Sequence, residues 1–247
     1  MIGIMAATSR SKTVGVLGGM GPEATVDFAA TVIAMTPAKS DQDHVHLIID
    51  NDPSIPPRQD AILRAGADPG PAMAAMAKRL QEAGADFLVM PCNTAYVFEE
   101  AIIAATKVPL ISIIAESIAA VRESAPDATA VGVLATDGCL QTGIYQSGIE
   151  AAGMTAVLPV AGEMEQIMVL INAIKAGNQG TAAGAGLKSL AEALITRGAD
   201  AIIAGCTEIP LVLTDEMVKV PLVSSTDALA LKTVRLARGD EALPESR

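Results

Sequence analysis

Two cysteines, Cys92 and Cys206, stand at corresponding places in two similar segments of the chain. Segments 84–94 and 198–208 both begin Gly-Ala-Asp, continue through an apolar run and place a cysteine eight residues after the glycine. A thiolate and a thiol on opposite faces of a bound carbon acid can remove a proton from one face and return one to the other. This chemistry inverts a stereocentre, so we predict a pair of opposed catalytic thiols.

The match extends beyond the cysteines. Residues 13–21 resemble residues 130–138 at an offset of 117, the cysteines differ by 114, and the Val-Pro segments at 108–112 and 220–224 differ by 112. A nearly constant offset indicates an internal duplication. Two copies of one unit would pack around a pseudo-twofold axis, and their cysteines would face each other across a cleft.

The elements that must position the thiols follow a βαβ pattern. Short runs rich in Val and Ile alternate with Ala-rich helical stretches, which predicts an α/β fold of two pseudo-symmetric parallel-sheet α/β domains with the active site in the cleft between them. We assign residues 13–115 plus 226–238 to an N-terminal α/β lobe carrying Cys92, and 116–225 to a C-terminal α/β lobe carrying Cys206. Residues 1–12 and 239–247 are predicted to be flexible tails.

Local signals place several of these elements. We expect a strand at 14–17, a glycine-rich turn, a helix from about 23 to 35 with Pro22 in its first turn, and a strand at 45–50. Prolines in the following loop, 51–58, favour an extended path that can aim Arg58. Helices are expected at 71–84, 141–152, 163–176, 181–197 and 227–238, with Asn93 and Thr94 capping a helix after Cys92.

Composition excludes several classes of protein. The chain of 247 residues has a formal charge of −11 and no basic stripe, which argues against nucleic-acid binding. No apolar run reaches the roughly 18 residues that span a membrane, and residues 1–12 lack the features of a secretory signal, so we expect a soluble, cytoplasmic protein without a membrane partner. Three cysteines do not form a disulfide framework, and neither His44 nor His46 has metal-ligand spacing to Cys92 or Cys206, so no metal is predicted.

Each cysteine falls between a buried strand and a helix start, where ligands usually bind in open α/β sheets. Backbone N–H groups and the helix dipole at such a position should favour the thiolate and lower its pKa below about 8.5. The alternative is that both are inert buried cysteines, which is the usual fate of a lone cysteine.

Four motifs, at residues 18–25, 51–58, 91–95 and 205–208, resemble the pyridoxal-independent aspartate/glutamate racemase family, particularly its aspartate racemase branch. The resemblance covers roughly residues 13–235. It implies a two-domain fold, commonly a homodimer, that racemises a dicarboxylic amino acid with two cysteines and no cofactor. By the family's handedness, Cys206 would take the proton from the L-enantiomer and Cys92 from the D-enantiomer.

The resemblance also implies substrate-binding residues. Asn93, Thr94 and Thr207 would hold the main carboxylate, Arg58 and Lys175 are the expected cations, and Glu208 would orient the ammonium or tune Cys206. The alternative for each residue is a purely structural role, as a helix cap, a surface charge or a favourable charge at a helix start. The complete predicted substrate-binding set is Met20, Asn51, Arg58, Asn93, Thr94, Thr136, Lys175, Thr207 and Glu208.

Two departures from the family pattern affect specificity. Tyr96 stands where the family commonly has His, and Asp137-Gly138-Cys139 replaces a Thr-Gly-Thr turn. The first concerns the tuning of Cys92, and the second alters a turn that would grip a carboxylate. We predict aspartate as the first substrate and glutamate as the second, although Asp137 and Cys139 could favour another substrate.

Rival functions remain at this stage. A sister enzyme of the hydantoin racemase, maleate isomerase or arylmalonate decarboxylase type would keep one or both cysteines, and a non-catalytic two-lobed binder would leave the α-proton of an amino acid untouched. A dinucleotide site is disfavoured because residues 18–21 lack the full G-x-G-x-x-G spacing.

Overall fold

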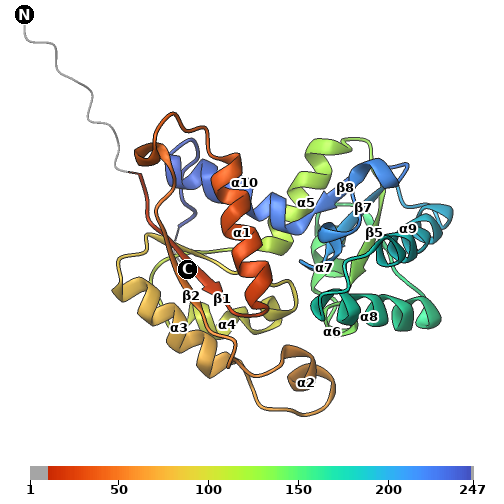
Figure 1. Ribbon diagram of the computed structural model, residues 1–247, viewed down its shortest axis with the longest axis horizontal. Helices are drawn as coiled ribbons and strands as arrows, with labels where there is room; N and C mark the ends of the chain where they lie inside the picture. Colours follow the sequence, from red (N-terminus) through yellow and green to blue (C-terminus); the bar gives the residue numbers. More distant parts are fainter. Residues whose placement is uncertain (1–10, 246–247) are drawn as a thin grey trace, which may run out of the picture.

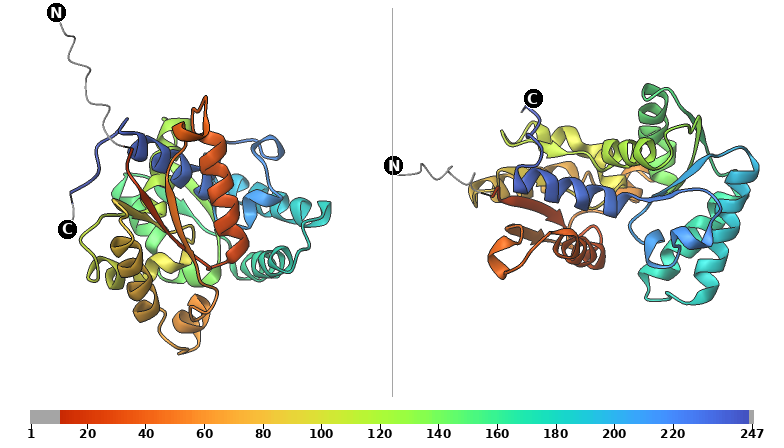
Figure 2. Two further views of the ribbon diagram at one scale, coloured as in Figure 1. Left: turned by 60° about the vertical axis from the view of Figure 1, so that its left-hand side comes forward. Right: turned by 90° about the horizontal axis from the view of Figure 1, so that it is seen from above.

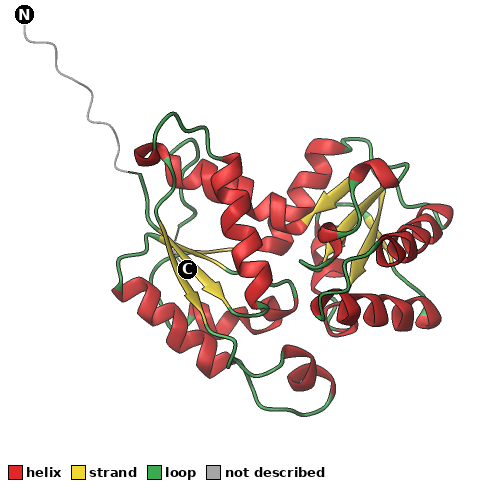
Figure 3. Cartoon of the chain, in the orientation of Figure 1, coloured by secondary structure: helices red, strands yellow, loops and turns green. Residues whose placement is uncertain are grey.

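The computed structural model describes residues 11–245 and contains two lobes, each built on a parallel sheet with flanking helices (Figure 1). The sheets have the strand orders β2-β1-β3-β4 and β6-β5-β7-β8, so the same connectivity occurs twice. We call the parts around these sheets the first and the second lobe. The predicted α/β fold with two matching parallel sheets is confirmed, and Figure 3 shows both sheets between their helices.

The first lobe contains the elements β1 (Val14–Gly18), α1 (Pro22–Met35), η1 (Asp41–Asp43), β2 (Leu47–Asn51), α2 (Arg58–Leu63), α3 (Gly70–Glu82), β3 (Phe87–Val89), η2 (Thr94–Phe98), α4 (Glu99–Ile103) and β4 (Leu110–Ile111). Helix α5 (Ile113–Ser124) leads to the second lobe. That lobe contains β5 (Ala130–Ala135), α6 (Asp137–Gln141), α7 (Ile144–Ala151), β6 (Thr155–Val157), α8 (Ala161–Lys175), α9 (Thr181–Thr196), β7 (Ala201–Gly205), η3 (Ile209–Leu211), η4 (Asp215–Met217) and β8 (Leu222–Ser224). The last helix is α10 (Ser225–Arg238).

The duplication extends to the conformation of single residues. Gly84 and Gly198, which precede β3 and β7, both have a φ of +98°, a conformation that favours glycine. Each is followed two residues later by an aspartate that binds the backbone at the start of the first strand of its lobe. The Asp86 carboxylate accepts a hydrogen bond from the Thr13 N–H at 2.6 Å, and the Asp200 carboxylate accepts one from the Ala130 N–H at 3.0 Å. The shared Gly-Ala-Asp sequence therefore encodes one turn that is used twice.

Close packing explains a second matched pair of glycines. Gly15 on β1 lies beside Leu88 in the strand register, and Gly132 on β5 lies beside Ile202. An added Cβ would approach the Leu88 side chain to 2.7 Å at the first site and the Ile202 side chain to 2.5 Å at the second. The same Cβ would approach Leu80 of α3 and Leu194 of α9 to 3.1 Å, so both sheets need glycine here for close packing of strand and helix.

Helix α10 joins the end of the second sheet to the first lobe. It packs against α1 and α5, and the Lys12 N–H donates to the Ala237 carbonyl at 2.8 Å. Figure 2 shows α10 lying along the first lobe. One continuous cluster of buried side chains includes Leu88 of the first sheet and Ile203 of the second, so the lobes share packing where they meet.

The proposed domain limits stay a prediction, and the boundary after residue 115 falls inside α5. The predicted tails lie partly outside the described residues, namely at 1–10 and 246–247. Within the described part, Glu241 pairs with Lys232 at 2.5 Å and Leu243 packs against the core. No helix in residues 11–245 is long and apolar enough to cross a membrane.

Several predicted bounds are wrong in detail. The helix predicted over 141–152 is two helices, because Gly143, with a φ of +74°, separates α6 from α7. Strand β6 was not predicted, and Arg58 begins helix α2 rather than ending an extended loop. The segment after Cys92 first forms the 3₁₀ turn η2, and the Asn93 side chain makes no capping bond there.

Candidate active site

Corresponding strands of the two sheets carry the two predicted catalytic cysteines. Cys92 follows β3 after two residues, and Cys206 directly follows β7. Both strands occupy the third place in their sheet, between the first strand of the lobe and an edge strand. The side chains are 8% and 6% exposed, respectively. The carboxyl ends of parallel strands are where open α/β sheets bind ligands, so both thiols lie at suitable positions.

A short chain of polar contacts surrounds Cys206. Its Sγ donates to Glu208 Oε2 at 2.9 Å, and the Thr207 hydroxyl donates to the same oxygen at 3.3 Å. The other carboxylate oxygen of Glu208 lies 3.6 Å from Lys175 Nζ. Glu208 is buried whereas Lys175 is partly exposed, so this carboxylate connects the thiol to a cation at the edge of the site.

The pKa of Cys206 is raised well above its ordinary value, chiefly because burial penalises the thiolate and also because the Glu208 charge lies beside it. Lys175 opposes this rise without overcoming it. The expectation that the helix start would lower this pKa is therefore wrong for Cys206. At neutral pH the side chain is a thiol, which fits a proton donor in the absence of substrate.

Lys175 connects the two thiols electrostatically. Burial lowers its pKa, but the neighbouring Cys206, Glu208 and Cys92 raise it by more, so the net shift is upward. Arg58 acts in the opposite direction as a second cation. The Lys175 ammonium thus stays charged, and its pKa responds to groups of both lobes.

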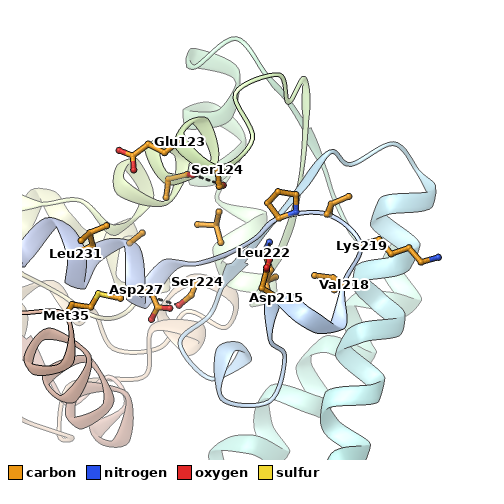
Figure 4. Close-up of a pocket in the computed structure, with 15 residues that line it drawn as sticks. Met35, Glu123, Ser124, Asp215, Val218, Lys219, Leu222, Ser224, Asp227 and Leu231 are labelled. Carbon is orange, nitrogen blue, oxygen red and sulfur yellow. Dashed lines mark hydrogen bonds between the residues drawn. The ribbon is translucent and has the colours of Figure 1, made fainter.

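A cavity of about 140 Å³ lies where these groups meet the start of α1. It is lined by Gly21, Pro22, Glu23, Ala24, Lys175, Glu208 and Leu211, so both lobes contribute to it. A larger cavity of about 760 Å³ lies elsewhere, between α5, α10 and the segment before β8 (Figure 4). Neither cysteine lines either cavity. We place the candidate site at the smaller cavity because Lys175 and Glu208 line it, and Glu208 accepts the hydrogen bond from Cys206.

Hydroxyl groups join the lobes beside Cys92. Thr94 and Thr136 share a hydrogen bond of 2.9 Å between their side-chain oxygens. Thr136 also caps α6 by accepting the Cys139 N–H at 3.3 Å. Asn93 has both ends of its amide occupied: Nδ2 donates to Ser225 Oγ at 3.0 Å, and Oδ1 accepts from the Tyr145 hydroxyl at 2.6 Å. Asn93 is therefore held by protein groups.

The remaining predicted residues lie along the first lobe. Met20 is buried in the turn after β1, and Asn51 is exposed at the end of the neighbouring β2. Arg58 Nη1 donates to the carbonyls of Ile55 and Pro56 at 3.2 and 2.9 Å, which fixes the proline-rich loop around it. Met20 follows β1, Asn51 ends the adjacent strand β2, and Arg58 follows β2, so all three come at or after the carboxyl ends of these strands.

The residues that depart from the family pattern have structural partners. The Tyr96 hydroxyl donates to the Ile111 carbonyl at 2.5 Å, and burial raises its pKa, so it stays protonated. Burial also raises the pKa of Cys139 to about 12, with a smaller effect from Cys92. Cys139 is thus an unreactive thiol at neutral pH. The Asp137 carboxylate accepts a hydrogen bond from Gln59 across the two lobes.

Sequence reasoning missed Tyr145, Ser225 and Gln59, which make contacts between the lobes. Their partners are 52, 132 and 78 residues away in the chain, so no local spacing indicates these contacts. The only signal in the sequence was that one of the two tyrosines of the chain falls within the helix predicted over 141–152. Among residues 11–245, no group of three or more His, Cys, Asp or Glu side chains is arranged to hold a metal ion.

Comparison with known proteins decides the family. The sequence model of the Asp/Glu/hydantoin racemase family matches residues 17–233. The chain belongs to this family. The broad-specificity amino-acid racemase RacX of Bacillus subtilis is 32% identical over 230 residues, which cover 90% of this chain and 96% of RacX. The predicted family resemblance is confirmed.

Solved structures agree with this family assignment. The aspartate racemase of Picrophilus torridus is 28% identical, has a TM-score of 0.82, and is matched over 94% of this chain and 96% of its own. A glutamate racemase from Francisella tularensis, solved in complex with D-glutamate, is 17% identical with a TM-score of 0.68, over 96% of this chain and 85% of its own. The latter similarity shows the fold alone. Family and relatives together point to an amino-acid racemase.

Proposed function

We propose that the protein is a cofactor-independent amino-acid racemase that uses Cys92 and Cys206 as a pair of acid and base. The observation that carries this proposal is the placement of both cysteines after corresponding strands of two duplicated sheets, with a Lys175 pKa that responds to both. Family membership supports the reaction class.

The protonation state of Cys206 determines which cysteine removes a proton and which one donates a proton. When Cys206 is a thiol and Cys92 a thiolate, Cys92 removes the α-proton of the D-enantiomer while Cys206 delivers its own proton to the opposite face. The product is the L-enantiomer, and the enzyme is left with a Cys92 thiol and a Cys206 thiolate. This second form carries out the reverse reaction, and exchange with solvent interconverts the two forms.

The developing carbanion needs electrostatic stabilisation because no pyridoxal is invoked. Hydroxyl donors at Thr94, Thr136 and Thr207, together with backbone N–H groups of the turn before α1, can bind the carboxylate on which charge accumulates. Lys175 adds a positive charge at the edge of the cavity. Arg58 would bind a second carboxylate if its guanidinium turned from the loop carbonyls to the substrate.

We propose aspartate as the first substrate and glutamate as the second. Support comes from the similarity to the Picrophilus torridus aspartate racemase, which exceeds that to the Francisella tularensis glutamate racemase. A second candidate is a racemase of broader specificity, favoured by the likeness to RacX and by the Asp137 carboxylate at the start of α6. An extra carboxylate beside the site would repel a dicarboxylic substrate.

Incubation of the reduced enzyme in D₂O with both enantiomers of aspartate, glutamate, alanine and lysine tests these assignments. Loss of the α-proton, followed by NMR, together with inversion detected by chiral chromatography, establishes a racemase and ranks its substrates. Preference for the dicarboxylic pair supports the first candidate, and preference for alanine or lysine supports the second. Binding without α-proton exchange would refute catalysis and favour a non-catalytic binder.

We also propose a homodimer in the cytoplasm. In support of the homodimer, Val26 and Ile33 are 63% and 55% exposed on α1, where another protein surface could cover them. Analytical ultracentrifugation tests the homodimer, and a monomer at micromolar concentration would refute it. Cell fractionation tests the location.

A further inference from the structure

Tyr145 touches the immediate neighbours of both candidate catalytic cysteines. Its side chain is fully buried in α7, and its hydroxyl donates to Asn93, the residue after Cys92. Its ring lies against Gly205, the residue before Cys206, where an added Cβ would be 2.9 Å from Cε2 and 3.3 Å from Cζ. One rigid side chain thus spans the distance between the two cysteine-bearing segments.

A buried polar network holds this side chain in place. The Tyr145 hydroxyl lies 3.4 Å from Ser117 Oγ on α5, and the Asn93 amide donates to Ser225 Oγ at the start of α10. Ser117 in turn donates to the Ile113 carbonyl at 2.6 Å. The loop after Cys92 is therefore bonded directly to α7 and α10 and, through Tyr145, to α5. Satisfied buried networks of this kind specify one geometry.

We propose that Tyr145 is a positioning residue that sets the placement of Cys92 relative to Cys206, an inference that rests on the proposed two-thiol racemisation. The two thiols must address opposite faces of one carbon atom. Misplacement of a reacting group by about 1 Å can reduce the rate by about a hundredfold. A buried tyrosine suits this task because its ring has two side-chain torsions and packing fixes both.

The protonation of Tyr145 is consistent with this role. Burial raises the pKa of its hydroxyl far above neutral pH, so the group stays a hydrogen-bond donor to Asn93. A hydroxyl that stays protonated cannot act as a base toward the α-proton, and its own proton is donated to Asn93. Tyr145 would therefore act through the geometry of the cysteines.

Tyr145→Phe removes the hydroxyl and keeps the ring. We expect kcat to fall about tenfold to a hundredfold in both directions, in line with a sub-ångström to 1 Å displacement. KM should stay within about twofold, because the groups proposed to bind the carboxylate are unchanged. The kinetic isotope effect with Cα-deuterated substrate should increase, since proton abstraction becomes more strongly rate-limiting.

Thr233→Val is the matched control. This buried hydroxyl on α10 donates to the Leu229 carbonyl at 2.7 Å, so its hydrogen bond stays within its own helix. The control should keep kcat while showing a similar loss of thermal stability. A second variant, Gly205→Ala, pushes a methyl group against the Tyr145 ring and should reproduce the fall in kcat if it folds.

A readout independent of catalysis completes the test. Dibromobimane should bridge Cys92 and Cys206 in the wild type, and mass spectrometry should show a lower bridged fraction in Tyr145→Phe than in Thr233→Val. Three results would overturn the inference. Tyr145→Phe could show the kcat and the bridged fraction of the wild type, both variants could lose kcat and bridging equally, or the wild type could show no bridging. If the wild type exchanges no α-proton, the proposed function fails, and the bridging yields alone decide on Tyr145.

Discussion

Glu208→Gln should lower the pKa of the Cys206 thiol. The variant keeps the size of the side chain and removes the negative charge that lies 2.9 Å from the sulfur. That charge is the second cause of the raised pKa, after burial. Burial is unchanged by the substitution, so the measurement tests the charge of Glu208 together with its hydrogen bond to the Cys206 thiol.

The magnitude follows from the distance. Two unit charges 2.9 Å apart repel by about 6 kcal/mol at an effective dielectric constant of about 20. This is an upper limit, because the thiolate and the carboxylate would move apart and Lys175, 3.6 Å from the other oxygen, offsets part of the repulsion. We expect the pKa of Cys206 to fall by about one to three units, the usual effect of a close charge.

The pKa can be measured by ultraviolet titration of the thiolate in a Cys92→Ser, Cys139→Ser background, where Cys206 is the remaining cysteine. Glu192→Gln serves as a control, because this glutamate pairs with Lys188 at 3.2 Å on the surface of α9. The control should leave the titration unchanged. An unchanged or higher pKa in Glu208→Gln would refute the role assigned to this carboxylate.

Three further predictions test other features. Cys92→Ser should reduce racemisation of every substrate by at least about a hundredfold, measured by chiral chromatography, because a serine hydroxyl is a far weaker acid than a thiol; a wild-type rate would exclude Cys92 as an acid or base. Gly132→Ala should cost about 1–3 kcal/mol in urea unfolding, because its Cβ would approach Ile202 to 2.5 Å, and unchanged stability would contradict the packing described. Hydrogen bonds, first of all from the Thr129 N–H, lower the pKa of Asp200. The Asp200 carboxylate therefore contributes to stability above its unfolded-state pKa of about 4, and this contribution is lost as pH falls through the lower folded-state pKa. Asp200→Asn should therefore flatten the pH dependence of unfolding below about pH 4, and an unaltered dependence would argue against this linkage.

The internal repeat made the fold predictable. Strand and turn signals recur at nearly constant spacing, and the repeated Gly-Ala-Asp turn has the same glycine conformation in both lobes. Short elements were harder to predict. Strand β6 has three residues at the edge of a sheet, and the break between α6 and α7 depends on a single left-handed glycine at position 143.

The cysteines could be predicted from sequence because they recur in the duplication, whereas the polar residues beside them were predicted only from the resemblance to the family. The pKa of Cys206 could not, because burial and the orientation of Glu208 outweigh the helix-start effect that the sequence suggests. The contacts of Tyr145 with Asn93 and Gly205 could not be predicted either, because they form only when segments distant in the chain pack together.

The isotope pattern of early turnover in D₂O tests the two-thiol mechanism most directly. Starting from L-aspartate, or from the best substrate found, the account predicts deuterium at Cα of the D-product while the recovered L-substrate stays unlabelled, because Cys206 removes the substrate proton and deuterated Cys92 supplies the label. A D-product that retains the substrate's own proton would indicate a single base and contradict the account.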